Sequence, residues 1–576
     1  MAEIVPTHRW NLPGPLPPVI GQLAQELKLP EPVVRLLWQR GYCTAAQIQE
    51  FLEPSASRLN RPDTLPDIAE ATHRVIAALK RQEPILVYGD YDVDGVTGTA
   101  LLFSVLQRLG GTVYYYLPHR EREGYGFSPS GVRFAQETGC RLIITNDCGS
   151  TDGATVRAAQ AAGIDTIITD HHEPGPEWPP ANAFVNPKRA DSDYPFPELA
   201  GCGVAFKLAW SVLAALHRPK EELIALLDLV GLATIADVVP LKGENRVLAR
   251  IGLGAISRTT RPGLQALIQA AGLNPKQLTG AGVLFGLAPR INAAGRVGHA
   301  QEALRLLLTE DPTEAQALAR RLDRLNRSRQ SLEDRTRRAA AQLIEEARLA
   351  DQRVIVVAGE NWHEGVIGVV AARLVEQFYR PCIVVTLKGE IGKGSGRSVT
   401  GFNLYQALQA CRAHLTGFGG HRYAAGLRLV RSQLEPLRAA INQFAAALPE
   451  ELFQPSLHIE AVAELAEIDQ RLLAALARLE PFGPDNPEPI FATLGLEVVG
   501  FPRRIGREQN HLKFRVRSGN RVLAAVAWGR SSDIVNLEIG RKNHLDICYT
   551  ITPDRYAGRN GPQLNVLDLR TTQRVP

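Results

Sequence analysis

The chain has 576 residues, 45% of them hydrophobic and 22% charged, which is the balance of an ordinary folded protein rather than a disordered or fibrous one. This length predicts about three to five compact units, and the lack of any uncharged apolar run of about 18 residues excludes a membrane-spanning helix. The 65 Lys and Arg exceed the 60 Asp and Glu so slightly that the total charge does not by itself indicate a nucleic-acid partner.

The first 80 residues predict a mostly helical region, because apolar residues recur at helical spacing between proline-broken segments. Residues 81–312 begin with short apolar runs that alternate with helix-length segments and continue into a more helical part. The runs lie at 85–88, 113–117, 142–145 and 166–169, at intervals of roughly 25 residues. Alternation at this spacing predicts βαβ units and a mainly parallel sheet.

Residues 313–349 contain neither Gly nor Pro and predict one long helix that joins two lobes. Residues 350–450 again alternate, with strands expected at 354–357 and 382–386 around a helix at 368–377. In residues 451–576, short alternating runs such as 511–517 and 522–528 predict a small antiparallel β-domain. The expected fold class is therefore α/β with an additional C-terminal β-domain.

Three carboxylates directly follow the first predicted strand, at Asp90, Asp92 and Asp94. Ligands of open α/β sheets bind just beyond the carboxyl ends of strands, and three anions crowded there need a cation to neutralise them. A calcium EF-hand is excluded, because its loop needs a Glu at the position of Leu101 and a helix in place of the strand. The alternative is a polar turn in which the Asp side chains bond nearby backbone.

Acidic and histidine side chains also follow later apolar segments. They are Asp147 after the third strand, Asp170, His171 and His172 after the fourth, and Asp237 at the end of an apolar segment. Taken singly, Asp147 and Asp237 are typical of helix N-caps. The repetition at successive strand ends instead favours one shared metal site, and mixed carboxylate and imidazole ligands favour Mn²⁺ or Mg²⁺. The set suffices for two ions, the arrangement that serves in-line phosphoryl displacement.

These motifs resemble those of a known superfamily. The segments DYDVDG, NDCG, TDHH and TIADVVPL are similar to the four motifs of the DHH phosphoesterases, and the chain from about residue 80 onward resembles the RecJ family of single-strand-specific DNA exonucleases. The resemblance implies that the metal ligands are Asp90, Asp92, Asp94, Asp147, His171 and Asp237. It also implies that His172 is a catalytic residue beside the scissile phosphate and that Asp170 orients the histidines. Tyr88 stands where many relatives of the wider superfamily have His, so the first metal would depend more on the aspartates.

Residues 350–450 resemble the DHH-associated domain of the same superfamily, which binds nucleic acid. Gly-rich segments at 394–398 and 417–421 would let backbone N–H groups approach an anion as loops, although alone they are equally typical of tight turns. The resemblance implies that nucleic acid contacts Arg296, Arg373, Arg397, Ser398 and His421. His363, in the segment 361–366, also matches the family and is equally compatible with a structural role.

The charge is unevenly distributed along the chain. Residues 501–576 contain 14 Lys and Arg against 6 Asp and Glu, a net charge of +8, whereas the first 500 residues have a net charge of −3. The segment 479–489 resembles the start of the family's oligonucleotide-binding (OB) fold, a small β-barrel. The positive charge of this β-domain, together with Phe514, Trp528 and Tyr556, predicts a groove that stacks bases and binds phosphates. The alternative is a solvated basic surface. Eight arginines at 320–338 on the long helix, against three acids, would line the same channel.

The resemblance implies a metal-dependent exonuclease that degrades single-stranded DNA from the 5′ end to 5′-mononucleotides, in DNA repair and recombination. One alternative is a DHH phosphoesterase for short oligoribonucleotides or nucleotide phosphates, which would not need the lead-in region or the basic C-terminal domain. Another is a non-catalytic replication scaffold, which would not need the full set of acids and histidines. The absence of a GxxxxGK[ST] motif excludes a P-loop ATPase.

The remaining expectations concern partners and location. The family suggests contacts with single-strand-binding protein and a repair helicase, and we expect a monomer that does not bind membranes. The seven cysteines are scattered without a CxxC pair, and the N-terminus lacks the pattern of a signal peptide. We therefore expect a cytoplasmic protein without a disulfide scaffold or a structural zinc site.

Overall fold

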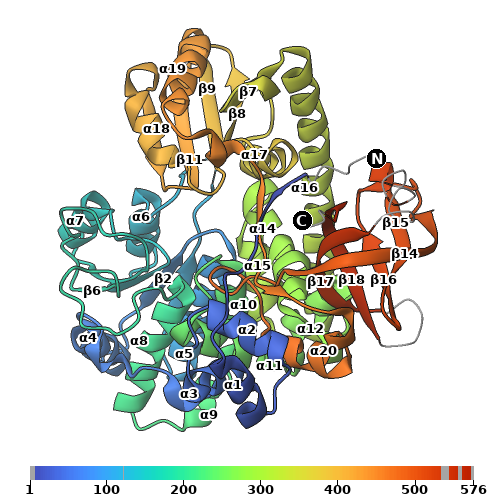
Figure 1. The fold of residues 1–576 in the computed structure, drawn as a ribbon. Helices are drawn as coiled ribbons and strands as arrows, with labels where there is room; N and C mark the ends of the chain where they lie inside the picture. Colours follow the sequence, from blue (N-terminus) through green and yellow to red (C-terminus); the bar gives the residue numbers. More distant parts are fainter. Residues whose placement is uncertain (1–6, 121, 534–536, 538–543, 555–560, 573–576) are drawn as a thin grey trace. The chain divides into compact units, whose positions relative to one another are not determined.

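A computed structural model describes residues 7–120, 122–533, 537, 544–554 and 561–572. The chain divides into two compact units (Figure 1). Unit 1 comprises residues 1–53, 450–480 and 487–576, and unit 2 comprises residues 54–449 and 481–486. Within the described ranges, no helix is long and apolar enough to cross a membrane.

Unit 2 contains the parallel sheet that the sequence predicts. Its strands are β2 (Ile85–Gly89), β3 (Val113–Tyr116), β4 (Leu142–Asn146), β5 (Asp165–Thr169) and β6 (Ala183–Val185). They lie in the order β3-β2-β4-β5-β6, and every neighbouring pair is parallel. The first four strands match the predicted runs, whereas β6 is too short to give a periodic pattern and was not predicted.

Helices cover both faces of this sheet, which explains why its strands read as continuous apolar runs. They are α4 (Ile68–Lys80), α5 (Val93–Arg108), α6 (Pro129–Glu137), α7 (Gly153–Ala161) and α8 (Gly201–Ala215). Successive residues of β2 alternate between two cores. Ile85 and Val87 face the larger core with α4, α5 and α8, whereas Leu86 and Tyr88 face the smaller core with α6 and α7.

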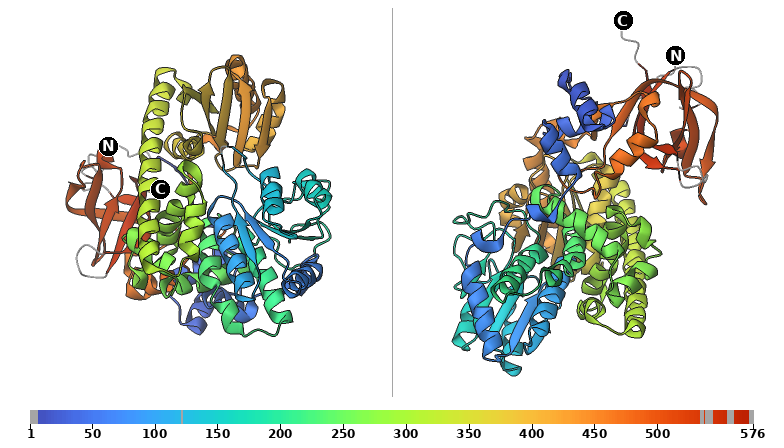
Figure 2. Two further views of the ribbon diagram at one scale, coloured as in Figure 1. Left: turned by 180° about the vertical axis from the view of Figure 1, so that it is seen from behind. Right: turned by 90° about the horizontal axis from the view of Figure 1, so that it is seen from below.

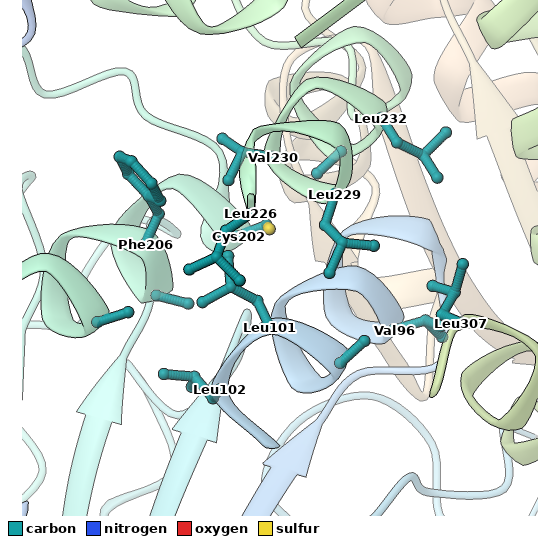
Figure 3. Close-up of a cluster of buried hydrophobic side chains, with 14 of the residues drawn as sticks. Val96, Leu101, Leu102, Cys202, Phe206, Leu226, Leu229, Val230, Leu232 and Leu307 are labelled. Carbon is teal, nitrogen blue, oxygen red and sulfur yellow. The ribbon is translucent and has the colours of Figure 1, made fainter. Parts of the chain in front are cut away.

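The larger core continues into the helical part of unit 2. The helices there are α9 (Lys220–Ile224), α10 (Leu227–Ala236), α11 (Gly243–Ser257), α12 (Pro262–Ala270), α13 (Gly280–Gly282), α14 (Ala288–Val297) and α15 (Gln301–Leu308), with a π-helical turn at Val283–Leu287. Figure 3 shows Leu101 of α5, Phe206 of α8 and Leu229 of α10 among these buried side chains. The core holds α5, α8 and α10 together, and one end of each helix reaches the site described below.

The predicted long helix is α16 (Pro312–Glu346), visible along its length in Figure 2. Asp311 caps its start by accepting a hydrogen bond from Thr313 N at 2.8 Å, and Pro312 occupies the first helical position, which proline favours. The helix packs against α12, α14 and α15 and then against α17. It therefore connects the parallel-sheet domain to the second α/β domain, as expected.

The second α/β domain contains a mixed five-stranded sheet. Its strands are β7 (Ile355–Glu360), β8 (Cys382–Lys388), β9 (Ile391–Arg397), β10 (Gly417–Gly420) and β11 (Ala424–Val430), and its helices are α17 (Glu364–Phe378), α18 (Leu404–Ala410) and α19 (Leu434–Ala446). The strand order is β10-β11-β9-β8-β7. Only the pair β7–β8 is parallel.

The two Gly-rich segments are strands, so their interpretation as loops or tight turns is wrong. Residues 394–397 belong to β9 and residues 417–420 to β10. A Cβ on Gly394 would lie 2.8 Å from Leu427 Cδ1, and a Cβ on Gly396 would lie 2.8 Å from Leu404 Cδ2. Alternate residues of a strand share a face, so these glycines leave room for leucines that pack over β9.

Unit 1 contains the expected C-terminal barrel. Its strands are β13 (Ala461–Val462), β14 (Phe491–Ile505), β15 (His511–Ser518), β16 (Arg521–Ala527), β17 (Leu545–Pro553) and β18 (Pro562–Thr571). The order is β13-β14-β15-β16-β18-β17, and an additional β14–β17 pairing closes five strands on themselves. The sheet is not wholly antiparallel as predicted, because β16 and β18 pair in parallel.

The three aromatic residues proposed for base stacking differ in their surroundings. Phe514 is only 3% exposed and belongs to the barrel core, so it is not available to a strand on the surface. Trp528 is 57% exposed, and Tyr556 lies outside the described residues. Phe501, which the sequence did not single out, is 74% exposed on β14.

The helical lead-in divides between the two units after residue 53. Unit 1 contains β1 (Arg9–Asn11), α1 (Val19–Leu27), α2 (Glu31–Gln39) and α3 (Ala45–Leu52), together with β12 (Ser456–His458) and α20 (Gln470–Ala477). Strand β1 pairs in parallel with β12. Arg40 forms a buried ion pair with Glu460 at 2.6 Å, so the N-terminal helices are bound to the segment that leads into the barrel.

Candidate active site

The carboxylates and histidines of the four motifs meet at one edge of the parallel sheet. Asp90 follows β2, Asp147 follows β4 and Asp170 follows β5. Since neighbouring strands are parallel, their carboxyl ends lie at the same edge, and the residues that follow them converge there. Asp237 reaches this edge from the end of α10.

Three overlapping groups of possible ligand atoms lie here, each within 4.8 Å. The groups are Asp90, Asp92 and Asp147; Asp94, His171 and Asp237; and Asp147, Asp170, His171 and His172. All eight side chains predicted to bind metal or to act in catalysis are therefore brought together. Asp147 and His171 each belong to two groups, so the groups form one continuous cluster.

Two of the β2 carboxylates lie at helix N-termini. Asp92 caps α5, accepting hydrogen bonds from Asp94 N at 2.9 Å and Gly95 N at 3.2 Å, so the polar-turn alternative describes part of what Asp92 does. Asp94 accepts hydrogen bonds from Gly201 N at 2.6 Å and Cys202 N at 2.8 Å at the start of α8. Burial and the charge of Asp92 nevertheless raise the pKa of Asp94 to about 7.

Asp147 and Asp237 are not helix N-caps, so that alternative is wrong for both. Helix α7 starts at Gly153, well after Asp147, and Asp237 stands at the C-terminal end of α10, where the helix dipole disfavours an anion. Asp147 also has a φ of +62°, a left-handed conformation that costs a non-glycine residue about 1–3 kcal/mol. Neither side chain has the structural role that an N-cap would give it, and strain of the kind seen at Asp147 clusters at functional sites.

Among the residues that the structure describes, no Lys or Arg forms an ion pair with Asp90, Asp147 or Asp237. Burial, and then the charges of neighbouring aspartates, raise the pKa values of Asp90, Asp147 and Asp237 well above their usual range. The Oδ1 atom of Asp90 and the Oδ2 atom of Asp237 are buried without a hydrogen-bond partner. Divalent cations would both neutralise these groups and satisfy the free oxygens, so the donor set fits Mn²⁺ or Mg²⁺.

The two histidines of the third motif have different surroundings. His171 Nε2 lies 3.1 Å from Asp147 Oδ1, 3.7 Å from Asp237 Oδ2 and 3.8 Å from Asp94 Oδ2. Burial and the neighbouring His172 lower the pKa of His171 to about 3, which keeps its ring neutral and suited to bind a metal.

His172 is held by Asp170. Its Nδ1 lies 2.8 Å from Asp170 Oδ1, and although burial favours the neutral ring, this hydrogen bond and the negative charge of Asp170 raise the pKa of His172. Asp170 also accepts hydrogen bonds from the backbone N of Ser150, His171 and His172. The pKa of Asp170 is lowered despite its burial, so it stays ionised and can orient both rings.

Tyr125 is a residue of this site that the sequence did not indicate. Its hydroxyl lies 2.9 Å from His172 Nδ1 and donates a hydrogen bond to the carbonyl oxygen of Asp147 at 3.3 Å. Its ring meets that of His172 at a centroid distance of 5.3 Å. The sequence feature that could have indicated Tyr125 is the Gly-Tyr-Gly segment around it. Gly124 and Gly126 both have positive φ and shape the loop.

Arginines from separate segments gather next to the carboxylates. Arg296 of α14 donates a hydrogen bond to Gly365 O at 3.3 Å. Burial and the positive charges of Arg120, Arg329 and Arg397 lower the pKa of Arg296 to about 10. Burial and Arg120 likewise lower the pKa of Arg397. Like charges that are buried together are costly unless an anion joins them, so this arginine cluster is suited to phosphate.

Arg120 was not predicted, because it lies in an irregular loop after β3. The other side chains that the sequence suggested as nucleic-acid contacts have different surroundings from this arginine cluster. Arg373 pairs with Glu376 at 2.9 Å and Glu333 at 3.5 Å, and Ser398 Oγ donates to Phe402 O at 2.9 Å. His421 is exposed at the end of β10. His363 caps α17 by accepting a hydrogen bond from Gly365 N at 3.0 Å, which is the structural role left open for it.

Comparison with known proteins gives a consistent result along the chain. Three family models match: the DHH family, N-terminal domain over residues 84–234, the DHHA1 domain over residues 351–447, and the RecJ OB domain over residues 459–568. The chain is 39% identical over 570 residues to the single-stranded-DNA-specific exonuclease RecJ of Bacillus subtilis, a match that covers 98% of this chain and 71% of that protein. The chain belongs to the RecJ family.

Solved structures of the RecJ family agree with this assignment. The crystal structure of RecJ in complex with Mn²⁺ from Thermus thermophilus is similar with a TM-score of 0.82 and 32% sequence identity, covering 98% of this chain and 80% of that chain. The Mg²⁺ complex from the same organism is similar with a TM-score of 0.76 and 30% identity, covering 98% and 79%. Membership of the RecJ family thus extends over both units of the chain.

Proposed function

We propose that this protein is a metal-dependent exonuclease that hydrolyses single-stranded DNA from the 5′ end and releases 5′-mononucleotides. The observation that carries the proposal is the buried cluster of carboxylates and imidazoles, with two unsatisfied oxygens, next to a cluster of arginines. The names of the RecJ relatives support the substrate, and the 5′ polarity rests on the resemblance to that family.

Two divalent ions, Mn²⁺ or Mg²⁺, would be held by the overlapping groups. Asp90, Asp92 and Asp147 would hold one ion, and Asp94, His171 and Asp237 the other. When bound, such ions supply an activated water and offset the charge of the phosphodiester. The RecJ structures from Thermus thermophilus, described as complexes with Mn²⁺ and with Mg²⁺, support this choice of metals.

The protein's own groups would position the substrate and move protons. Asp170 accepts a hydrogen bond from Nδ1 of His172 and raises the pKa of that ring, so the protonated ring would use Nε2 to donate to an oxygen of the scissile phosphate. Arg296 and Arg397, with Arg120, would bind the adjoining phosphates, because guanidinium groups match phosphate geometry. The roles of Arg373, Ser398 and His421 remain proposals.

The basic barrel would hold the incoming strand. The net charge of +8 in residues 501–576 and the exposed rings of Phe501 and Trp528 support stacking and phosphate contacts at this surface. A small-substrate DHH phosphoesterase would not need such a barrel. A scaffold without catalysis would not need eight acidic and histidine side chains within one cluster.

We also retain, as part of the proposal, a monomeric enzyme of DNA repair and recombination in the cytoplasm. The proposal includes contacts with single-strand-binding protein and a repair helicase.

The proposal also divides the chain into five parts: a lead-in (1–80), a catalytic domain (81–312), a connecting helix (313–349), a nucleic-acid-binding domain (350–450) and a barrel (451–576).

The test is product analysis of 5′- and 3′-labelled single strands with Mn²⁺ and with Mg²⁺. We expect mononucleotides released first from the 5′ end, no cleavage in EDTA, and loss of cleavage in Asp147→Ala and His171→Ala. Release first from the 3′ end would overturn the polarity. A preference for strands of two to five nucleotides would favour the small-substrate alternative, and metal-independent binding without cleavage would favour the scaffold.

A further inference from the structure

The outward face of α16 has a row of arginines that the candidate active site does not use. They are Arg320, Arg324, Arg327, Arg335 and Arg338, and all five are exposed. With 3.6 residues per helical turn, these positions fall on one face of the helix. At about 1.5 Å of rise per residue, the row extends about 27 Å along the helix axis. We call it the outer arginine row.

The opposite face of α16 packs against the rest of unit 2. Leu322 and Ala340 are fully buried there, and Arg329 lies on the same side, paired with Glu333 at 2.7 Å. Of the eight arginines expected to line one channel, Arg329 is the one named among the main charges that lower the pKa of Arg296. The outer arginine row faces away from that cluster and needs a different explanation.

Most of the charge in this row is uncompensated. Arg327 pairs with Asp323 at 2.8 Å, and among the described residues Arg335 donates only to the carbonyl oxygen of Ser331. Arg320, Arg324 and Arg338 have no acidic partner in the part of the chain that the structure describes. Like charges three or four residues apart destabilise a helix, so the row is unfavourable for the helix alone.

We propose that the outer arginine row binds the sugar-phosphate backbone of nucleic acid beyond the active site. The proposal rests on the proposed function, since the ligand would be part of the substrate. A straight line of guanidinium groups matches a linear series of phosphates, and arginine binds phosphate with paired hydrogen bonds. No aromatic side chain interrupts residues 320–338, so the contact would be independent of base sequence.

The test compares two triple variants with the same change in charge. One is Arg320→Gln, Arg324→Gln and Arg338→Gln, in which Gln retains the helix propensity of Arg. The control is Arg61→Gln, Arg157→Gln and Arg218→Gln, which alters exposed arginines elsewhere in unit 2. Binding of labelled DNA to the full chain is measured by fluorescence anisotropy in EDTA over a range of salt concentrations.

For a single strand of about 40 nucleotides, we expect the row variant to bind about tenfold more weakly at moderate salt. The slope of log affinity against log salt should fall by about 2, since each lost phosphate contact removes about 0.7. The control variant should retain both the affinity and the slope. With Mn²⁺ present, cleavage of strands of about six nucleotides should be unchanged in the row variant, because such strands are too short to extend from the active site to the outer arginine row.

A second arm uses a duplex with a short single-stranded tail. Weaker binding together with a lower salt slope for this substrate alone assigns the row to the duplex part of the same DNA and still supports backbone binding. Equal losses in both triple variants, or a salt slope in the row variant that is unchanged for both the single strand and the tailed duplex, would overturn the proposal. These binding measurements do not depend on cleavage, so a wild-type protein that fails to cut labelled strands would refute the proposed function without deciding this test.

Discussion

Tyr125 is 52% exposed as a residue, and its hydroxyl reaches the centre of the site. Its oxygen shares the proton on His172 Nδ1 with Asp170, while its own proton goes to the carbonyl of Asp147. Tyr125→Phe removes both contacts and keeps the ring. Since a hydrogen bond contributes about 0.5–1.5 kcal/mol, we expect kcat to fall about two- to tenfold with KM for single-stranded DNA unchanged.

The matched control for this prediction is Tyr114→Phe, a change of an exposed tyrosine on β3. Steady-state kinetics on the same labelled strand measure both variants. An unchanged kcat in Tyr125→Phe would show that the hydroxyl does not position His172. A rise in KM seen only in Tyr125→Ala would instead assign the exposed ring to substrate binding.

Asp237 illustrates a carboxylate that stabilises the protein only with a cation. Its Oδ2 has no hydrogen-bond partner, and burial raises its pKa. In EDTA, Asp237→Asn should stabilise the protein by on the order of 1 kcal/mol, because one partly buried charge that neighbouring aspartates repel is removed. Saturating Mn²⁺, at about a hundredfold over Kd, should stabilise the wild type by about 2.7 kcal/mol and the variant much less.

Thermal unfolding with EDTA and with Mn²⁺ checks this pair of effects. Glu137→Gln, a change of an exposed carboxylate on α6, should change neither the stability in EDTA nor the stabilisation by Mn²⁺. Loss of stability in Asp237→Asn without metal would mean that the carboxylate is satisfied by the protein itself. The same variant should lack exonuclease activity in either metal.

At the scale of elements, α8 and α11 are joined by a fully buried ion pair between Lys207 and Glu244. Lys207 also donates to Asn60 O at 2.6 Å, and Glu244 accepts from Tyr194 Oη at 2.6 Å. Glu244→Gln leaves Lys207 buried without its counter-charge and should cost about 3–5 kcal/mol in urea unfolding. Adding Lys207→Met should recover part of that loss, and a double variant as unstable as the sum of both single variants would contradict this coupling.

Strand β9 depends on glycine for packing rather than for a bend. A Cβ on Gly394 would lie 2.8 Å from Leu427 Cδ1 and 2.9 Å from its Cγ, whereas the nearest atom to a Cβ on Gly426 is 4.0 Å away. Gly394→Ala should therefore destabilise the protein by about 1–3 kcal/mol through overpacking. Gly426→Ala is the control and should be nearly neutral. Equal effects of the two changes in urea unfolding would refute this explanation of the glycines.

For the whole molecule, prediction from the sequence succeeded best where polar site residues directly follow a clear pattern of apolar strand residues. Asp90, Asp147 and Asp170 could be placed together because each directly follows an apolar strand and parallel strands end at one edge. Arg120 and Tyr125 could not, because they lie in an irregular loop that has no periodicity. The glycines of β9 were misread for a related reason: without side chains, a strand has no alternating pattern. The roles of the site residues remain predictions.

The two units have separate cores, and this leads to a prediction about unfolding of the whole chain. We expect calorimetry to show two transitions, because each unit loses its own buried surface. Mn²⁺ should raise only the transition of unit 2, which contains the carboxylate cluster. Arg40→Ala leaves the buried Glu460 carboxylate without its ion-pair partner and should destabilise unit 1 by about 3–5 kcal/mol. Only the transition temperature of unit 1 should therefore fall. A single transition that responds to both changes would show that the units unfold together.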